Sequence, residues 1–381
     1  MVTPQAAHIS GALEHMMAEL TKNQHFVPRL LLRNFAGGED GVVQVFDSKR
    51  GVLRPQTSVR RVLSQNYFYD DDNIVESFLA KHVEGPAAPI IESIIQNPGI
   101  AIPNGSLELL RFICVQMNRT PGALDTALEV IDKFTATVFQ RLGELNGFPA
   151  EDMAGIKLKL QDERVLLGSQ TIEGALNWPL VRDLSWHVLS NGTSLPFVIS
   201  DNPVVRYNWY LRDSRDPSYT SLTKHGVQIF MPLSPVVTLA LVDKSIYKFG
   251  KKHCHHSVLL NAQDVELLNS LQFRNRQSFI VFPEYLSACY VKERCRALPA
   301  SSIFENHAWS SELVQADSKN LKSTHAVWRT QARFPYWLSI SKVKRKIFKG
   351  ELLCHDREPE TVEAQRAFIK MARENRHGSM L

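Results

Sequence analysis

Apolar residues are spaced differently in the two halves of this chain. In the first half they recur every three or four residues, which is the spacing of one buried helix face. Helices are expected at residues 73–96, 107–119, 122–144 and 151–180. Because proline cannot continue a helix undisturbed, Pro86 and Pro89 are expected to kink or divide the first of these helices.

Beyond residue 190 the apolar segments become shorter. They are rich in β-branched and aromatic residues and are bounded by prolines, which favours strands. Strands are expected at 197–200, 227–231, 236–242 and 279–282, with one helix at 263–273. The pattern predicts an α+β fold, in which a mainly helical N-terminal half packs on a mixed or antiparallel sheet.

Three regions follow from this change of pattern. Residues 1–190 are predicted to be mainly helical, with a small hairpin near 42–55. Residues 191–300 are predicted to carry the sheet of the same domain. Residues 301–381 have weaker patterns and are expected to form a C-terminal extension, whose densest basic run is 342–349.

Composition narrows the class of protein. The 381 residues are 44% hydrophobic and 22% charged, as in ordinary globular proteins, and no apolar run approaches a membrane span. The first residues lack the form of a signal peptide, and the five cysteines are odd in number with no CxxC pair. We therefore expect a cytoplasmic protein with no membrane partner and no disulfide framework. The charge of +5 leans toward an anionic partner such as nucleic acid, and the oligomeric state stays open.

Residues 24–35, Gln-His-Phe-Val-Pro-Arg-Leu-Leu-Leu-Arg-Asn-Phe, are the first stretch with candidate chemistry. Pro28 suits the first turn of a helix, so His25 is expected just before it, near the positive end of the dipole. A histidine held there tends to stay neutral, which suits a base or a hydrogen-bond donor. Arg29 is then a candidate for binding substrate. The alternative is that His25 caps the helix and the arginines are solvated.

Gln116 and Arg119 form the second candidate pair. They are three residues apart, so they share a face of a helix that is otherwise apolar nearly all round. Such a helix is buried, and a buried arginine needs an anionic or carbonyl partner. Arg119 is therefore expected either to make an internal salt bridge or cap, or to face a cavity and hold a phosphate or carboxylate.

Carboxylates provide the remaining candidates. Asp201 and Asn202 follow an apolar strand and precede Pro203, a position that often holds catalytic or metal-binding groups. The alternative there is a plain Asx-turn. Glu84 directly precedes the Gly85-Pro86 break and is expected to project into a cleft, whereas Glu76 on the same helix more easily fits a solvated face.

Other ligand patterns are weak. The cluster His253-Cys254-His255-His256 lacks a second half at metal-finger spacing. The sequence also has no Gly-rich phosphate loop and no GxSxG elbow.

Four short motifs, in order, carry a resemblance to a known family. They are His25-Phe-Val-Pro28, Gln116-Met-Asn-Arg119-Thr-Pro121, Ser200-Asp-Asn-Pro203 and Pro232-Leu-Ser-Pro235. Together they resemble the bacterial family called domain of unknown function 4238 over roughly residues 22–285. The resemblance marks positions of interest and implies no activity.

The candidates together suggest an enzyme. A histidine base, carboxylates and an arginine in one cleft suit a metal-dependent phosphodiester hydrolase, a nuclease acting on nucleic acid, for which a role as a bacterial toxin or defence effector is expected. The alternative is a non-catalytic binding module for an anionic ligand or a partner protein. The residues assigned to the hydrolase are as follows: catalytic, His25, Glu84, Gln116, Arg119 and Asp201; substrate-binding, Arg29 and Asn202; ligands of a divalent Mg²⁺ or Mn²⁺, Glu84 and Asp201.

Overall fold

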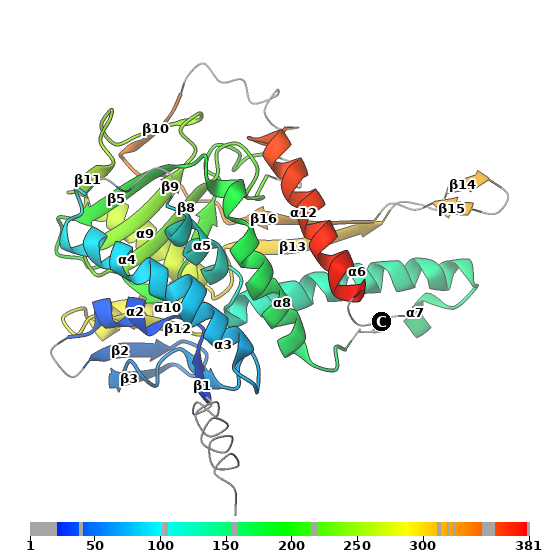
Figure 1. The fold of residues 1–381 in the computed structure, drawn as a ribbon, viewed down its shortest axis with the longest axis horizontal. Coiled ribbons are helices and arrows are strands. Elements are labelled where there is room, and N and C mark those ends of the chain that lie inside the picture. The colour runs from blue at the N-terminus through cyan, green and yellow to red at the C-terminus, as the bar shows by residue number, and fades with distance from the viewer. Residues whose placement is uncertain are drawn as a thin grey trace, which may run out of the picture.

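The structure is a computed structural model. It describes residues 21–37, 41–100, 102, 106–153, 159–214, 219–310, 314–317, 320–322, 325–344 and 355–378. Figure 1 shows sheets and helices gathered on one side, with one long helix and a long hairpin extending away from them. The fold is α+β, as the sequence predicts.

A five-stranded mixed sheet forms the centre of the second half. Its order is β11 (His256–Leu259), β5 (Ser185–Asn191), β9 (Val237–Val242), β8 (Gln228–Ser234) and β7 (Val205–Tyr207). Only the pairing of β11 with β5 is parallel. The strands predicted at 227–231 and 236–242 are confirmed as β8 and β9, whose residues are all buried.

The predicted hairpin joins a second sheet. Its strands β2 (Val42–Asp47) and β3 (Val52–Ser58) pair with each other, and β2 also pairs with β12 (Phe279–Phe282), which pairs with β6 (Ile199–Ser200). All three pairings are antiparallel. Residues from the first and second regions of the chain therefore share one sheet.

Helices dominate residues 74–176, as predicted. They are α3 (Ile74–Leu79), α4 (Gly85–Gln96), α5 (Leu107–Gln116), α6 (Pro121–Leu145), α7 (Ala150–Met153) and α8 (Glu163–Leu176), and a 3-10 turn at Trp178–Val181 follows. A π-helical turn, Ala80–Glu84, separates α3 from α4, which begins next to Pro86. The expected division is confirmed next to Pro86, whereas Pro89 lies inside α4.

The helix predicted after Pro28 is shorter than expected. Pro28 is the N-cap of α2 (Arg29–Leu32), which gives way at once to a 3-10 turn, Arg33–Phe35. Before it, β1 (Asn23–His25) pairs with β4 (Ser64–Asn66). His25 therefore lies in a strand, and a four-residue helix provides little of the dipole on which the sequence prediction relied.

One apolar core connects the helices with the mixed sheet. The helix α5 buries seven of its ten residues, among them Phe112, Ile113 and Val115, as its nearly all-round apolar character predicts. These pack in the same cluster as Ile229 of β8 and Leu239 of β9. The helical half and the sheet thus fold as one unit.

Residues 247–378 add further elements, most of which the sequence did not predict. Helices α9 (Ala262–Asn275), α10 (Ala288–Ala297) and α12 (Pro359–Gly378), and strands β10 (Tyr247–Phe249), β13 (Phe304–Ser310), β14 (Val314–Asp317), β15 (Asn320–Lys322), β16 (His325–Gln331) and β17 (Ser341–Val343) complete the fold, with only α9 expected. The hairpin of β13 and β16 lies along α6 (Figure 1). Most of the basic run at 342–349 lies outside the described residues. Within the described residues no helix has the length and apolar character needed to cross a membrane.

Candidate functional site

The first predicted cluster is a packed clamp on the His25–Phe26 backbone. The Arg119 guanidinium is 1% exposed and donates to Glu84 Oε1 at 2.7 Å, to the His25 carbonyl at 2.8 Å and to the Phe26 carbonyl at 3.3 Å. Gln116 Nε2 donates to the same Phe26 carbonyl at 2.8 Å. The expected internal partners of Arg119 are thus present, and they are both a carboxylate and carbonyls.

The His25 side chain is buried in this clamp. Its Nε2 lies 3.2 Å from the Val59 carbonyl, and burial lowers the pKa of the imidazole, with the cations of Arg29 and Arg119 adding to this effect. The predicted neutral state therefore results from burial rather than from a helix dipole. Neither His25 nor Arg119 lines either of the two cavities described below, so their assignment to a shared cleft stays a prediction.

Asp201 holds a loop in place. Its carboxylate is buried and accepts three backbone N–H groups, from Gln277 at 2.7 Å, Ser278 at 2.7 Å and Phe279 at 2.9 Å. Burial raises the pKa of Asp201 to about 6, and the three hydrogen bonds oppose that rise. With both oxygens occupied by amides, this carboxylate fixes the 277–279 backbone, a longer-range task than the Asx-turn considered from the sequence.

The remaining predicted residues lie apart. Glu84 pairs with Arg119 and Asp201 with backbone amides, so the two proposed metal ligands have separate partners. Among the residues described, no three His, Cys, Asp or Glu side chains gather as metal ligands would. Arg29 is exposed at the start of α2. Asn202 alone lines the larger cavity, where its Oδ1 accepts from Thr120 Oγ1 at 3.0 Å.

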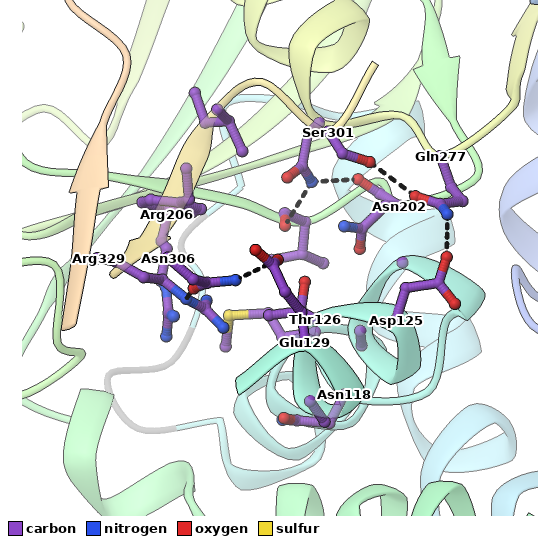
Figure 2. Close-up of a pocket in the computed structure, with 18 of the residues that line it drawn as sticks. Asn118, Asp125, Thr126, Glu129, Asn202, Arg206, Gln277, Ser301, Asn306 and Arg329 are labelled. Carbon is purple, nitrogen blue, oxygen red and sulfur yellow. Dashed lines mark hydrogen bonds between the residues drawn. The ribbon is translucent and has the colours of Figure 1, made fainter. Parts of the chain in front are cut away.

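That cavity, of about 480 Å³, opens beside the first turns of α6 (Figure 2). Thr120 caps α6 through a 3.2 Å hydrogen bond from Ala123 N, and Pro121 occupies the first turn, so the helix begins at a fixed place. The other walls come from β7, the segment 275–277, β13 and β16. Most lining side chains are polar, among them Asn118, Gln170, Asn177, Asn202, Asn275 and Gln277.

Two arginines stand together in its wall, and we call it the arginine cavity. Arg206 of β7 and Arg329 of β16 lie over the ring of Phe304, at 5.5 and 5.7 Å from its centroid. Arg329 Nε donates to Asn306 Oδ1 at 2.7 Å. The Arg206 guanidinium makes no hydrogen bond or ion pair with any residue that the structure describes, although its backbone pairs with Ile229 of β8. Burial and the nearby Arg329 lower the pKa of Arg206 to about 9, which still leaves it charged at neutral pH.

Two carboxylates of α6 face the same cavity, one helical turn apart. Burial opposes the ionisation of Glu129, but hydrogen bonds from Lys133 and from Asn306 Nδ2 outweigh it and hold its pKa below the usual value. Burial raises the pKa of Asp125, which accepts a hydrogen bond from Gln277. Figure 2 shows Glu129 next to Asn306 and Arg329, and Asp125 on the other side of the cavity next to Gln277.

A second cavity, of about 410 Å³, adjoins the first, and we call it the hairpin cavity. It is lined by Lys49, Arg54 and Arg61 from the hairpin β2–β3 and the turn after it, and by Phe279 of β12. Asp201 also lines this cavity, and its carboxylate accepts hydrogen bonds from the amides of Ser278 and Phe279. Asp125 and Gln277 line both cavities.

A family model matches residues 23–284, more than two thirds of the chain. The chain belongs to the DUF4238 family. The family is described as a protein of unknown function, and the match confirms the resemblance to this family that the sequence showed. No curated protein and no solved structure matches the chain.

The DUF4238 region and the arginine cavity coincide only in part. The clamp residues, Asp125 and Arg206 lie inside residues 23–284, whereas Phe304 and Arg329 lie beyond them. Sequence reasoning missed both arginines. For Arg206 a signal existed, because a cation between the buried Val205 and Tyr207 must point to the opposite side of a strand. For Arg329, in a half-buried strand of mixed composition, we find no comparable signal.

Proposed function

We propose that this DUF4238 protein binds an anionic small molecule in the arginine cavity. The observation that carries the proposal is Arg206, a half-buried guanidinium that lies over Phe304 and next to a second guanidinium, without a hydrogen-bond or ion-pair partner among the described residues. Two adjacent cations repel each other, and desolvating them costs free energy unless an anion is present. This favours the binding module over the hydrolase among the two functions expected from the sequence.

The chemistry of the walls indicates the class of ligand. Guanidinium groups offer planar forks of N–H donors that match the oxygens of phosphates and carboxylates. The amides of Asn177 and Asn202 at the α6 end suit hydroxyl or amino groups. A volume of about 480 Å³ lies within the range of small-molecule sites, which is roughly 300–1,000 Å³. A phosphorylated metabolite fits these features.

Thermal unfolding in the presence of inorganic phosphate tests the proposal. A ligand that binds only the folded state raises the melting temperature, so phosphate should do so relative to chloride at equal ionic strength. Arg206→Gln should abolish that rise, because it removes the unpaired cation and keeps a polar side chain of moderate length.

Arg296→Gln is the matched control, because Arg296 is exposed on α10 and lines neither cavity. This variant should respond to phosphate as the unmodified protein does. If phosphate raises the melting temperature of the Arg206→Gln protein equally, the arginine cavity is not the anion site.

Hydrolysis of a phosphodiester in the same cavity is the second candidate function. Its supporting observation is the pair Asp125 and Glu129, whose carboxylates share the cavity with the arginines. Mg²⁺ is commonly held by one or two carboxylates together with phosphate oxygens and waters, so these two residues are the candidate ligands in place of Glu84 and Asp201. Arg206 would then stabilise the charge that develops on the phosphate.

Incubating labelled single-stranded DNA and RNA with the purified protein and Mg²⁺ or Mn²⁺ tests this candidate. Cleavage that is lost in Glu129→Gln and retained in Arg296→Gln would support it. Absence of cleavage, together with phosphate binding that depends on Arg206, would leave the binding function alone. The toxin or defence role was inferred from nucleic-acid hydrolysis, so this assay tests that role as well.

A further inference from the structure

The arginine cavity and the hairpin cavity share two lining residues, Asp125 and Gln277. Gln277 Nε2 donates to the Asp125 carboxylate, and Gln277 Oε1 accepts from Ser301 Oγ at 2.7 Å (Figure 2). The Gln277 backbone is fixed by the 2.7 Å bond to Asp201. The side chains of Asp125 and Gln277, which line both cavities, therefore lie where the two cavities adjoin.

The two cavities repeat one combination of residues. In the arginine cavity, Arg206 and Arg329 lie over Phe304. In the hairpin cavity, Arg54 lies over the ring of Phe279 at 5.4 Å. Both phenylalanines are half-buried, so each cavity places a π-surface next to a guanidinium.

The hairpin cavity has three cations, which differ in their partners. Arg54 forms a salt bridge with Asp47 at 2.6 Å. Lys49 and Arg61 are exposed and make no salt bridge or side-chain hydrogen bond in the part of the chain that the structure describes. Unpaired positive charge is thus present at both ends of the joined cavities, with the Asp125–Gln277 contact between them.

We infer that the two cavities together bind one single-stranded oligonucleotide. Its phosphates would meet Arg206 and Arg329 at one end and Lys49 and Arg61 at the other. Its bases would stack on the phenylalanine rings or on the guanidinium planes over them. Positive grooves with interleaved aromatic rings are how proteins bind single strands, and a duplex keeps its bases stacked inside, out of reach. The inference rests on the proposed anion site and extends it to a polymer.

Fluorescence anisotropy with a labelled oligothymidylate of about eight nucleotides tests this inference. Lys49→Gln and Arg61→Gln should each weaken binding several-fold and lower the slope of log K against log salt by about 1. Neither variant should change the effect of inorganic phosphate on thermal unfolding, because their side chains lie in the hairpin cavity. Asp125→Asn should tighten oligonucleotide binding, since it removes a negative charge from the path of the strand.

The outcomes separate the two proposals. One outcome is that Arg206→Gln abolishes phosphate binding while Lys49→Gln and Arg61→Gln leave oligonucleotide affinity unchanged. In that case one oligonucleotide does not bind across both cavities, and the arginine cavity is still an anion site. A blunt duplex of the same length bound as tightly as the single strand would also overturn the inference. If Arg206→Gln affects neither ligand, the proposed function itself fails.

Discussion

The guanidinium of Arg119 lies 2.8 Å from the carbonyl oxygen of His25, and the Tyr69 hydroxyl donates to that same oxygen at 3.2 Å. Two motifs that are more than ninety residues apart in the chain are thus joined through backbone atoms. The identity of the His25 side chain matters little for this contact, whereas the arginine is required. Such a contact stabilises the fold, and we expect the clamp to matter for stability before it matters for activity.

Replacing Arg119 by glutamine should destabilise the protein strongly. The change leaves Glu84 and two buried carbonyls short of donors, and breaking a buried ion pair in this way costs about 3–5 kcal/mol. Urea unfolding measures the free energy directly. Arg111→Gln, at a half-buried position on α5, should change the free energy of unfolding by less than about 1 kcal/mol. An equal decrease in the free energy of unfolding in both variants would show that the Arg119 contacts do not stabilise the fold.

Asp201→Asn should lower the melting temperature. Asparagine offers one acceptor oxygen where the carboxylate offers two, and its amide group would face a backbone N–H. Losing a charge-assisted bond in a buried site costs about 2 kcal/mol. Asp132→Asn is the control, because Asp132 lies half-buried on α6 and Asp201 is fully buried. An unchanged melting temperature in Asp201→Asn would show that the loop holds itself without the carboxylate.

Glu76 should make stability depend on pH. Burial raises its pKa to about 7, with Glu84 and Asp70 adding to the rise and Arg119 opposing it. The unfolded chain releases this proton near the ordinary value of 4.5, so between these two pKa values the folded state binds more protons. Stability from this group therefore falls as pH rises from 4.5 to about 7, and the loss is complete above that.

Glu76→Gln tests this dependence. The variant should be more stable than the unmodified protein at about pH 8, and the difference should disappear toward about pH 4. Chemical denaturation across this range gives both curves. A difference that stays constant with pH would mean that Glu76 titrates normally in the folded protein.

Arg206→Gln should stabilise the protein when no anion is present. The substitution removes a desolvated cation next to Arg329, and relieving unfavourable charge at a binding site commonly gains about 0.5–2 kcal/mol. Calorimetry in a buffer without phosphate or sulfate measures this gain. A loss of stability would instead mean that Arg206 contributes to packing through the Phe304 ring.

The sequence predicted those parts of the molecule in which neighbouring residues decide the structure. The division of the helix at Pro86, the burial of α5 and the strands β8 and β9 all follow from local spacing. The sequence also predicted one cleft shared by His25, Glu84, Gln116, Arg119 and Asp201. In the structure Arg119 contacts Glu84 and the His25 carbonyl, whereas Asp201 binds the 277–279 backbone. Local pattern cannot tell whether a buried arginine faces a ligand or a carbonyl, because both satisfy it equally well.

The arginine cavity could not be predicted in this way. Arg206 and Arg329 are 123 residues apart and meet only because β16 pairs with β13 alongside α6. Short strands of mixed composition carry little periodicity, so such long-range pairing leaves almost no trace in the sequence. Asp201 was predicted to be a catalytic and metal-binding carboxylate, but its partners are amides of a segment about 76 positions later.

The position of the β13–β16 hairpin late in the chain determines when, during synthesis, the anion site is completed. Phe304 and Arg329 complete a wall whose opposite side, at Asn118 and Asp125, is made some two hundred residues earlier during synthesis. The clamp and most of the core need nothing beyond residue 284, so a nascent chain has its scaffold long before it has its pair of arginines. We therefore expect a nascent chain to bind the anion only after the β13–β16 hairpin has been synthesised and has packed against α6.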